Sequence, residues 1–343
     1  MDHGQYSPQH AGSLRYWLGL LNAGVQLTKP GIIFGNLASV LGGYFLADGG
    51  RLADPAHLLA TLLGTALVIG CGCVINNCAD RDIDRRMVRT CHRALALRTI
   101  AVPTAASYAI ALGVSGFGLL WAGSNLLACC LALVGLVIYA GVYTFWLKRR
   151  SHWGTLVGSL SGAMPPVTGY CAVTARFDAT AMMLVLVFCC WQMPHSHAIT
   201  VMRREDFRAA RLPLLTLSQA HRQIQAYTLA FFASTLLLGV VAQMGILYFV
   251  VISALGGYWL ALANSSVRWV DPTRWARSIF GFSILLVMAL NLTLALSSLY
   301  RATCESSWAN QLADRVLQSA RIHAPVYRHA QASLSRSPSL AGP

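Results

Sequence analysis

The chain has 343 residues, of which 56% are hydrophobic and only 11% are charged, and its mean hydropathy is +0.54. Soluble domains carry roughly a quarter charged residues, so this composition excludes an ordinary soluble protein and indicates a polytopic membrane protein. The net charge of +14 does not indicate a nucleic-acid partner, because the basic residues gather in short loops between apolar runs.

The order of apolar runs predicts an all-α fold of nine transmembrane helices. Residues 14–28 resemble an amphipathic helix at the membrane surface, and runs long enough to cross a bilayer follow. These runs are 31–47, 58–78, 100–121, 126–147, 154–174, 180–200, 226–244, 246–265 and 279–300. We therefore divide the chain into an N-terminal segment (1–30), a membrane domain (31–300) and a polar tail (301–343).

The distribution of Lys and Arg predicts the orientation in the lipid bilayer. Nineteen of them lie in the N-terminal segment and in loops 79–98, 148–153, 201–222 and 266–278, whereas the opposite loops hold only Arg51 and Arg176. The positive-inside rule places the side with nineteen basic residues in the cytoplasm. The tail should then lie on the outer side.

Three polar residues at the end of the second apolar run share one helical spacing. Asn76, Asp80 and Asp84, here called the acid ladder, stand at i, i+4 and i+8, which stacks them on one helix face, while Asp82 points away. A solvated helix end is the plain alternative. Carboxylates aligned at i+4 repel each other unless a cation neutralises them, and acids beside a membrane span favour a functional role. The ladder therefore predicts a Mg²⁺ site that is completed by substrate phosphates.

A second polar segment ends the sixth apolar run with the sequence WQMPHSHAITVMRREDF (residues 191–207). It places His195 and His197 inside the run, and the pair Glu205–Asp206 after it. Because both acid-bearing loops are expected on the cytoplasmic side, carboxylates and arginines from the two loops can share one anionic ligand. The anionic ligand that suits these groups is a diphosphate at the mouth of an apolar cavity. If its hydrophobic chain lies in the membrane, the ligand is a prenyl diphosphate.

The fifth apolar run carries two further patterns. Gly154, Gly158 and Gly162 repeat every four residues, which favours close helix contact. Pro165–Pro166 follows, and we expect it to break the helix within the membrane, where irregular backbone is tolerated only against protein or a cavity. A cavity beside the break and a simple packing kink are both compatible with the pattern.

Several stretches resemble the intramembrane prenyltransferase superfamily and, within it, the protohaem IX farnesyltransferase (haem O synthase) family. These are LTKPGIIFGNLASVLGGYFLA (27–47), NNCADRDIDRRMVRT (76–90), GVYTFWLKRRSHWGTLVGSLSGAMPPVTGYCAVT (141–174) and WQMPHSHAI (191–199). The resemblance covers nearly all of residues 25–300. It departs at His197, where the family pattern has Tyr, at Glu205, where Lys is common, and in the segment 91–95.

The resemblance implies that the nine transmembrane helices surround a central cavity. It also implies Mg²⁺-dependent transfer of farnesyl from farnesyl diphosphate to a vinyl group of protohaem IX (haem B), in a bacterial inner membrane. It implies that Asn76, Asp80 and Asp84 hold the Mg²⁺–diphosphate and that Asp206 belongs to the second conserved loop. The cationic partners of the diphosphate are implied to be Lys29, Arg93, Lys148 and Arg203. His195 would contact haem, and His197 would be structural.

Other functions remain open at this point. A prenyltransferase for an aromatic quinone precursor shares the chemistry, but the chain lacks a second full D-x3-D motif. A non-catalytic haem-binding assembly factor would explain the histidines but not the ladder. A transporter would place its acids nearer the membrane midplane. Association with a haem A synthase or a terminal oxidase is not decided by the sequence.

Overall fold

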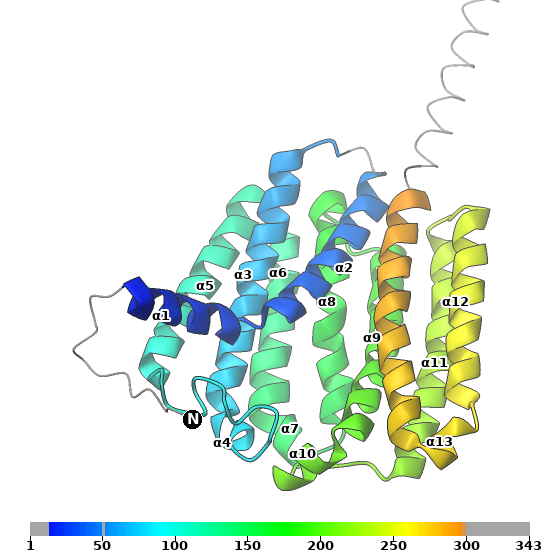
Figure 1. Ribbon diagram of the computed structural model, residues 1–343. Coiled ribbons are helices and arrows are strands. Elements are labelled where there is room, and N and C mark those ends of the chain that lie inside the picture. Colours follow the sequence, from blue (N-terminus) through cyan, green and yellow to red (C-terminus); the bar gives the residue numbers. More distant parts are fainter. Residues whose placement is uncertain (1–13, 50–51, 298, 300–343) are drawn as a thin grey trace, which may run out of the picture.

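The computed structural model describes residues 14–49, 52–297 and 299, and within these ranges the regular structure is helical, without strands (Figure 1). The predicted all-α class is confirmed. The helices are α1 (Leu14–Leu27), α2 (Pro30–Asp48), α3 (Pro55–Ala79), α4 (Arg81–Asp84), α5 (Val102–Gly123), α6 (Leu126–Leu136), η2 (Val137–Leu147), α7 (Lys148–Arg150), α8 (Gly154–Thr174), α9 (Ala179–Met202), α10 (Arg204–Ala209), α11 (Leu217–Val241), α12 (Ile246–Asn264) and α13 (Val267–Val270). A last long helix follows at Pro272–Ser297.

Eight helices in the described part of the chain are long and apolar enough to cross a membrane, which confirms a multi-pass membrane protein. The fifth predicted span also forms a helix, the 21-residue α8, but α8 is not among those eight. Most residues in the second half of α8 are buried among the other helices, so this half presents little surface to the lipid. The number nine and the central cavity therefore stay predictions, and the tail 301–343 lies outside the described residues.

Most predicted spans differ from the helices by only a few residues. The main exception is the predicted span 226–244, because α11 already begins at Leu217. Thr216 caps this helix, and Gln219 completes a capping box with it, so local chemistry sets the start. The first two turns are polar and carry no hydropathy signal, which is why an apolar-run search begins too late.

The expected break at Pro165–Pro166 is wrong, because α8 is continuous from Gly154 to Thr174 with both prolines inside it. Tight packing on α2 supports the helix at this level. A Cβ atom at Gly43 would collide with the carbonyl oxygen of Pro166, and one at Gly169 would collide with that of Val40. Neighbouring helices can hold a proline-containing membrane helix in shape, and here the two glycines let α2 approach closely.

The helices pack as neighbouring pairs: α3 with α5, α2 with α8, α9 with α8 and α11, and α11 with α12. Figure 1 shows α1 lying across the bundle and the short helices α4, α7, α10 and α13 gathered at one end. The described part of the final helix ends at the opposite end of the bundle. The loops that carry the basic residues therefore share one end of the bundle, as expected from the distribution of Lys and Arg.

The fourth crossing helix changes its winding halfway along. It starts as the α-helix α6 and continues through Val137–Leu147 as an 11-residue π-helix, η2, before α7. π-Helical segments are rare and frequently lie at functional sites. The sequence search assumed 3.6 residues per turn and did not predict this change.

Candidate active site

The acid ladder keeps its helical register in the structure. The backbone N–H of Asp80 donates to the Asn76 carbonyl at 2.9 Å, and that of Asp84 donates to the Asp80 carbonyl at 2.8 Å, so α3 continues into α4. Asn76, Asp80 and Asp84 are only 3%, 2% and 5% exposed. The Asp82 side chain is 49% exposed and pairs with Arg149 at 2.7 Å. The spacing thus places the ladder on one buried face and Asp82 on another.

Asp80 has one occupied and one free carboxylate oxygen. Its Oδ2 accepts a hydrogen bond from Asn76 Nδ2 at 2.9 Å and an ion pair from Lys148 Nζ. Its Oδ1 is buried and has no hydrogen-bond partner. A buried carboxylate oxygen without a partner costs free energy, so this oxygen is available to accept from a ligand.

Asp84 is neutralised by a loop residue. One guanidinium nitrogen of Arg93 lies 3.0 and 2.9 Å from the two carboxylate oxygens of Asp84 and also donates to Asn77 Oδ1 at 3.3 Å. Asn77 in turn donates to the Leu27 carbonyl at 2.8 Å. Asn77 therefore ties the loop arginine and the end of α1 to α3, a role that the sequence analysis did not assign.

Lys29 enters the site from the junction of α1 and α2. Its backbone is left-handed (φ 54°), an uncommon conformation for Lys, and its Nζ donates to Asn76 Oδ1 at 2.6 Å. Burial lowers the pKa of Lys29 to about 8, and the nearby charges of Arg93 and Lys148 act in the same direction. This pKa means that an additional negative charge at the site would stabilise the charged form of Lys29.

The π-helix η2 aligns three polar contacts with the ladder helix. Thr144 Oγ1 accepts from Asn76 Nδ2 at 3.0 Å, and Lys148 pairs with Asp80. Arg149, five residues after Thr144, contacts Asp82 and also donates to the Ala79 carbonyl at 2.6 Å. Thr144 lies in η2, and Lys148 and Arg149 follow it in α7, so the end of this crossing helix supplies all three contacts.

The second acid-bearing loop contacts the first one through backbone and apolar groups. Asp206 Oδ1 accepts from the Val88 N–H at 3.2 Å, and an apolar cluster joins the loops. The cluster consists of Ile83, Met87, Ala210 and Leu212, with Phe207 packed against it. Glu205 instead pairs with Arg208 at 2.8 Å, and both are exposed. Within the described residues Asp206 thus positions the loop, whereas Glu205 faces solvent.

Two more arginines lie beside this contact. Burial and the guanidinium groups of Arg93 and Arg203 lower the pKa of Arg89, and the carboxylates of Asp206 and Asp84 oppose that shift. The Arg203 guanidinium makes no hydrogen bond or ion pair with any residue that the structure describes. The sequence analysis predicted Arg203 but missed Arg89, which nothing in the spacing of the loop distinguishes from its neighbours.

The residues of the ladder fit a hard divalent cation that is completed by a substrate. Among the described residues, no group of three or more His, Cys, Asp or Glu side chains could hold a metal on its own. Mg²⁺ commonly takes one or two carboxylates together with substrate phosphates and keeps several waters. The free buried Oδ1 of Asp80 suits that donor set, and the oxygens of Asn76 and Asp84, which accept from Lys29 and Arg93, lie on the same helix face.

The two histidines of the sixth span lie in different surroundings. The His195 ring packs between Trp191 and Phe280, each with a centroid separation of 4.8 Å, and its Nδ1 lies 2.8 Å from Ser283 Oγ. His197 is 3% exposed, and its Nε2 has no partner. It lines a hollow of about 50 Å³ that Lys148 also lines. The histidine next to the site is thus His197, which the sequence analysis treated as structural.

These observations define a multi-pass helical membrane protein with buried carboxylates and cations at the ends of its membrane helices. The chain belongs to the UbiA prenyltransferase family, whose pattern matches residues 36–296. The family predicted from the motifs is confirmed.

Curated relatives extend the likeness over most of the chain. A "Protoheme IX farnesyltransferase 2" of Pseudomonas putida is 49% identical over 278 residues, which covers 80% of this chain and 94% of the relative. A "Protoheme IX farnesyltransferase" of Pseudomonas savastanoi is 50% identical over 275 residues, which covers 79% and 93%.

Solved structures share the fold at low sequence identity. A digeranylgeranylglyceryl phosphate synthase is 15% identical with a TM-score of 0.65, covering 82% of this chain and 99% of the other. A UbiA homologue from Archaeoglobus fulgidus bound to GPP and Mg²⁺ is 17% identical with a TM-score of 0.57, covering 80% and 99%.

Proposed function

We propose that this chain transfers the farnesyl group of farnesyl diphosphate to a vinyl group of protohaem IX, giving haem O. Relatives that are 49% identical over 80% of the chain carry the corresponding name, which supports this acceptor. The single observation that supports the chemistry is the free, buried Oδ1 of Asp80 among cationic side chains. Unlike the carboxylates of a solvated helix end, this oxygen is shielded from water and is available to a ligand.

The charge at the site suits a diphosphate. Five cationic side chains (Lys29, Arg89, Arg93, Lys148 and Arg203) accompany three carboxylates (Asp80, Asp84 and Asp206), which leaves an excess of two positive charges. A bound divalent cation, which we expect to be Mg²⁺ held by Asn76, Asp80 and Asp84, would add charge that stabilises the leaving diphosphate. Charge-assisted hydrogen bonds from Lys and Arg orient the phosphate oxygens.

The reaction follows from these charges. The allylic C–O bond of farnesyl diphosphate breaks, and the diphosphate leaves with the electron pair while Lys148, Arg93 and Arg203 stabilise its charge. The π electrons of the haem vinyl group then form the new C–C bond with the allylic carbon. The cation left on the former vinyl group takes up water and loses a proton, which gives a hydroxyethylfarnesyl side chain. The apolar bundle keeps water away until that bond has formed.

The membrane topology completes the proposal. We infer that the protein lies in a bacterial inner membrane with loops 79–98 and 201–222 in the cytoplasm, where prenyl diphosphate is available as a soluble anion. The positive-inside rule supports this orientation.

His195 would contact haem from α9, with Nε2 as the ring nitrogen that Ser283 leaves available.

The test is pigment extraction. Cells that lack haem O are given this gene, and the extracted haem is analysed by mass spectrometry. A haem that has gained one farnesyl group and one hydroxyl group supports the proposal. A prenylated aromatic acid with unmodified haem B would instead assign the chain to quinone-precursor synthesis. Unmodified haem and quinone pools, with the protein present in the membrane, would reject a prenyltransferase function.

A further inference from the structure

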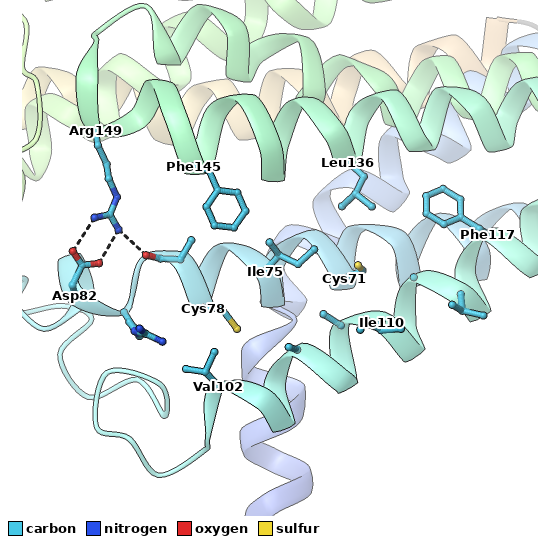
Figure 2. A pocket seen from close by; sticks show the side chains of 16 residues that line it. Cys71, Ile75, Cys78, Asp82, Val102, Ile110, Phe117, Leu136, Phe145 and Arg149 are labelled. Atoms are coloured by element: carbon cyan, nitrogen blue, oxygen red, sulfur yellow. Dashed lines mark hydrogen bonds and ion pairs between the residues drawn. The ribbon is translucent and has the colours of Figure 1, made fainter.

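A large groove runs along the outer side of the bundle, separate from the acid ladder. It has a volume of about 1030 Å³ and lies between α3, α5 and the continuous helix of α6 and η2 (Figure 2). None of the three ladder residues lines it. It uses a different face of α3, with Cys71, Ile75 and Cys78, and continues to Asp82 of α4. The groove is therefore not a part of the site described above.

The walls of the groove are apolar and face the lipid. Ile110 and Val114 on α5 are 65% and 69% exposed, and Phe145 on η2 is 62% exposed. Figure 2 shows side chains of α5 and η2 along the two sides, with α3 between them. Between Val102 and Phe117, which both line the groove, α5 rises by about 22 Å, more than the ~15 Å depth of one bilayer leaflet. An extended hydrocarbon chain fits such a groove.

The end of the groove at the basic loops is polar, and one of its cations has no partner among the described residues. Arg149 binds Asp82 at 2.7 and 2.8 Å, so these two lining charges neutralise each other. Arg81 also lines this end, is exposed, and its guanidinium makes no hydrogen bond or ion pair with any described residue. Within the described part of the chain, the groove thus combines an apolar channel with one unpaired guanidinium at membrane-surface level.

We propose that this groove binds one anionic phospholipid, with the phosphate on Arg81 and an acyl chain between α3, α5 and η2. Basic pockets between membrane helices on the cytoplasmic side bind anionic lipid headgroups. A prenyl diphosphate carries more negative charge than one guanidinium offsets, and the ladder with its five cations is the better place for it. The lipid supports the face of α3 that lies opposite the ladder and so stabilises the packing of α3 on η2.

The experiment measures lipid binding to the full chain by native mass spectrometry, with phosphatidylglycerol and phosphatidylcholine titrated onto delipidated protein. Arg81→Gln removes the cation, and Ala106→Trp fills the groove from an exposed position on α5. The matched controls are Arg86→Gln, in the same loop, and Ala111→Trp, on the same helix, both exposed and outside the groove. Thermal melting of each variant in detergent without lipid checks folding.

We expect one phosphatidylglycerol to bind the native protein more tightly than phosphatidylcholine. Arg81→Gln should weaken that binding about fivefold, since one basic side chain near an anionic lipid contributes about that factor. Ala106→Trp should abolish it, and both controls should bind as the native protein does. The proposal is overturned by equal affinity for the two lipids, by an equal loss in Arg86→Gln, or by one-for-one displacement of the lipid by farnesyl diphosphate. If Ala106→Trp does not fold, the comparison of lipid binding between Arg81→Gln and Arg86→Gln decides on its own.

Discussion

Lys148 pairs with one carboxylate oxygen of Asp80 and leaves the other oxygen buried and without a partner. The two residues are 68 positions apart in the chain: Asp80 caps the C-terminal end of α3, and Lys148 begins α7 at the end of the fourth crossing helix. The pair therefore fixes one oxygen and directs the second towards a ligand. This half-occupied carboxylate distinguishes a binding site from a salt bridge that is complete in itself.

Substitutions in the ladder should separate its two faces. Asp80→Asn and Asp84→Asn should each reduce haem O formation by at least about 100-fold, because each removes a carboxylate from a charge-stabilising site. Asp82→Asn should retain most activity, since an exposed ion pair contributes only about 0–1 kcal/mol. The measurement is the mass of the extracted haem at matched protein levels in the membrane. An equal loss in Asp82→Asn would contradict the assignment of the faces.

Metal removal tests the role of the ladder directly. Activity in membranes should vanish with excess EDTA and return with added Mg²⁺, because substrate phosphates and two carboxylates bind a hard cation together. Farnesyl transfer is followed with radiolabelled farnesyl diphosphate and haem B. The Asp80→Asn variant serves as the control, and added Mg²⁺ should not restore it. Full turnover in EDTA would exclude a divalent cation from the reaction.

The Lys148–Asp80 pair predicts a non-additive double mutant. Lys148→Met should lower stability by about 3–5 kcal/mol, because it leaves a buried carboxylate without its cation. Adding Asp80→Asn should recover most of that stability but no activity, since the buried charge is then absent together with the ligand. Thermal melting in detergent gives the stability and pigment mass gives the activity. Additive losses in the double mutant would show that the two side chains act independently.

The close crossing of α2 and α8 predicts different outcomes for two glycines of one helix. Gly43→Ala should strongly reduce the amount of folded protein, because its Cβ would collide with the Pro166 carbonyl oxygen. The matched control is Gly35→Ala in the same helix, where a Cβ atom would have no neighbour within 4 Å. This control should be neutral or stabilising by about 0.5–1 kcal/mol. Size-exclusion chromatography in detergent measures the folded fraction, and equal yields of the two variants would disprove the tight crossing.

The ladder is the part of the site that local sequence reasoning predicts best. Asn76, Asp80 and Asp84 belong to one helix, so the helical repeat alone fixes their common face and sends Asp82 elsewhere. The partners of the ladder come from other helices and loops. Lys29 and Lys148 were implied by the family resemblance, and their contacts with Asn76 and Asp80 require the folded bundle.

Other features carry no local signal at all. Thr144, which accepts from Asn76, lies in η2, and a search with 3.6 residues per turn cannot find the π-helical winding of this segment. The continuity of α8 through Pro165 and Pro166 depends on α2 packing against it, which overrides the local tendency of proline to break a helix. Arg89 joins the site through the fold of its loop, so its charge alone does not distinguish it.

The two histidines give the last prediction. His195→Ala should lower haem O formation and shift the Soret band of the haem-loaded protein if Nε2 binds the iron, because Ser283 already occupies Nδ1. His197 is buried with a free Nε2 beside the hollow that Lys148 lines, so His197→Phe should raise the KM for farnesyl diphosphate and leave the Soret band unchanged. The His197→Tyr variant carries the residue of the family pattern. Tyr restores a polar group there, so this variant should keep most activity. A Soret shift in His197→Phe with none in His195→Ala would reverse the two roles.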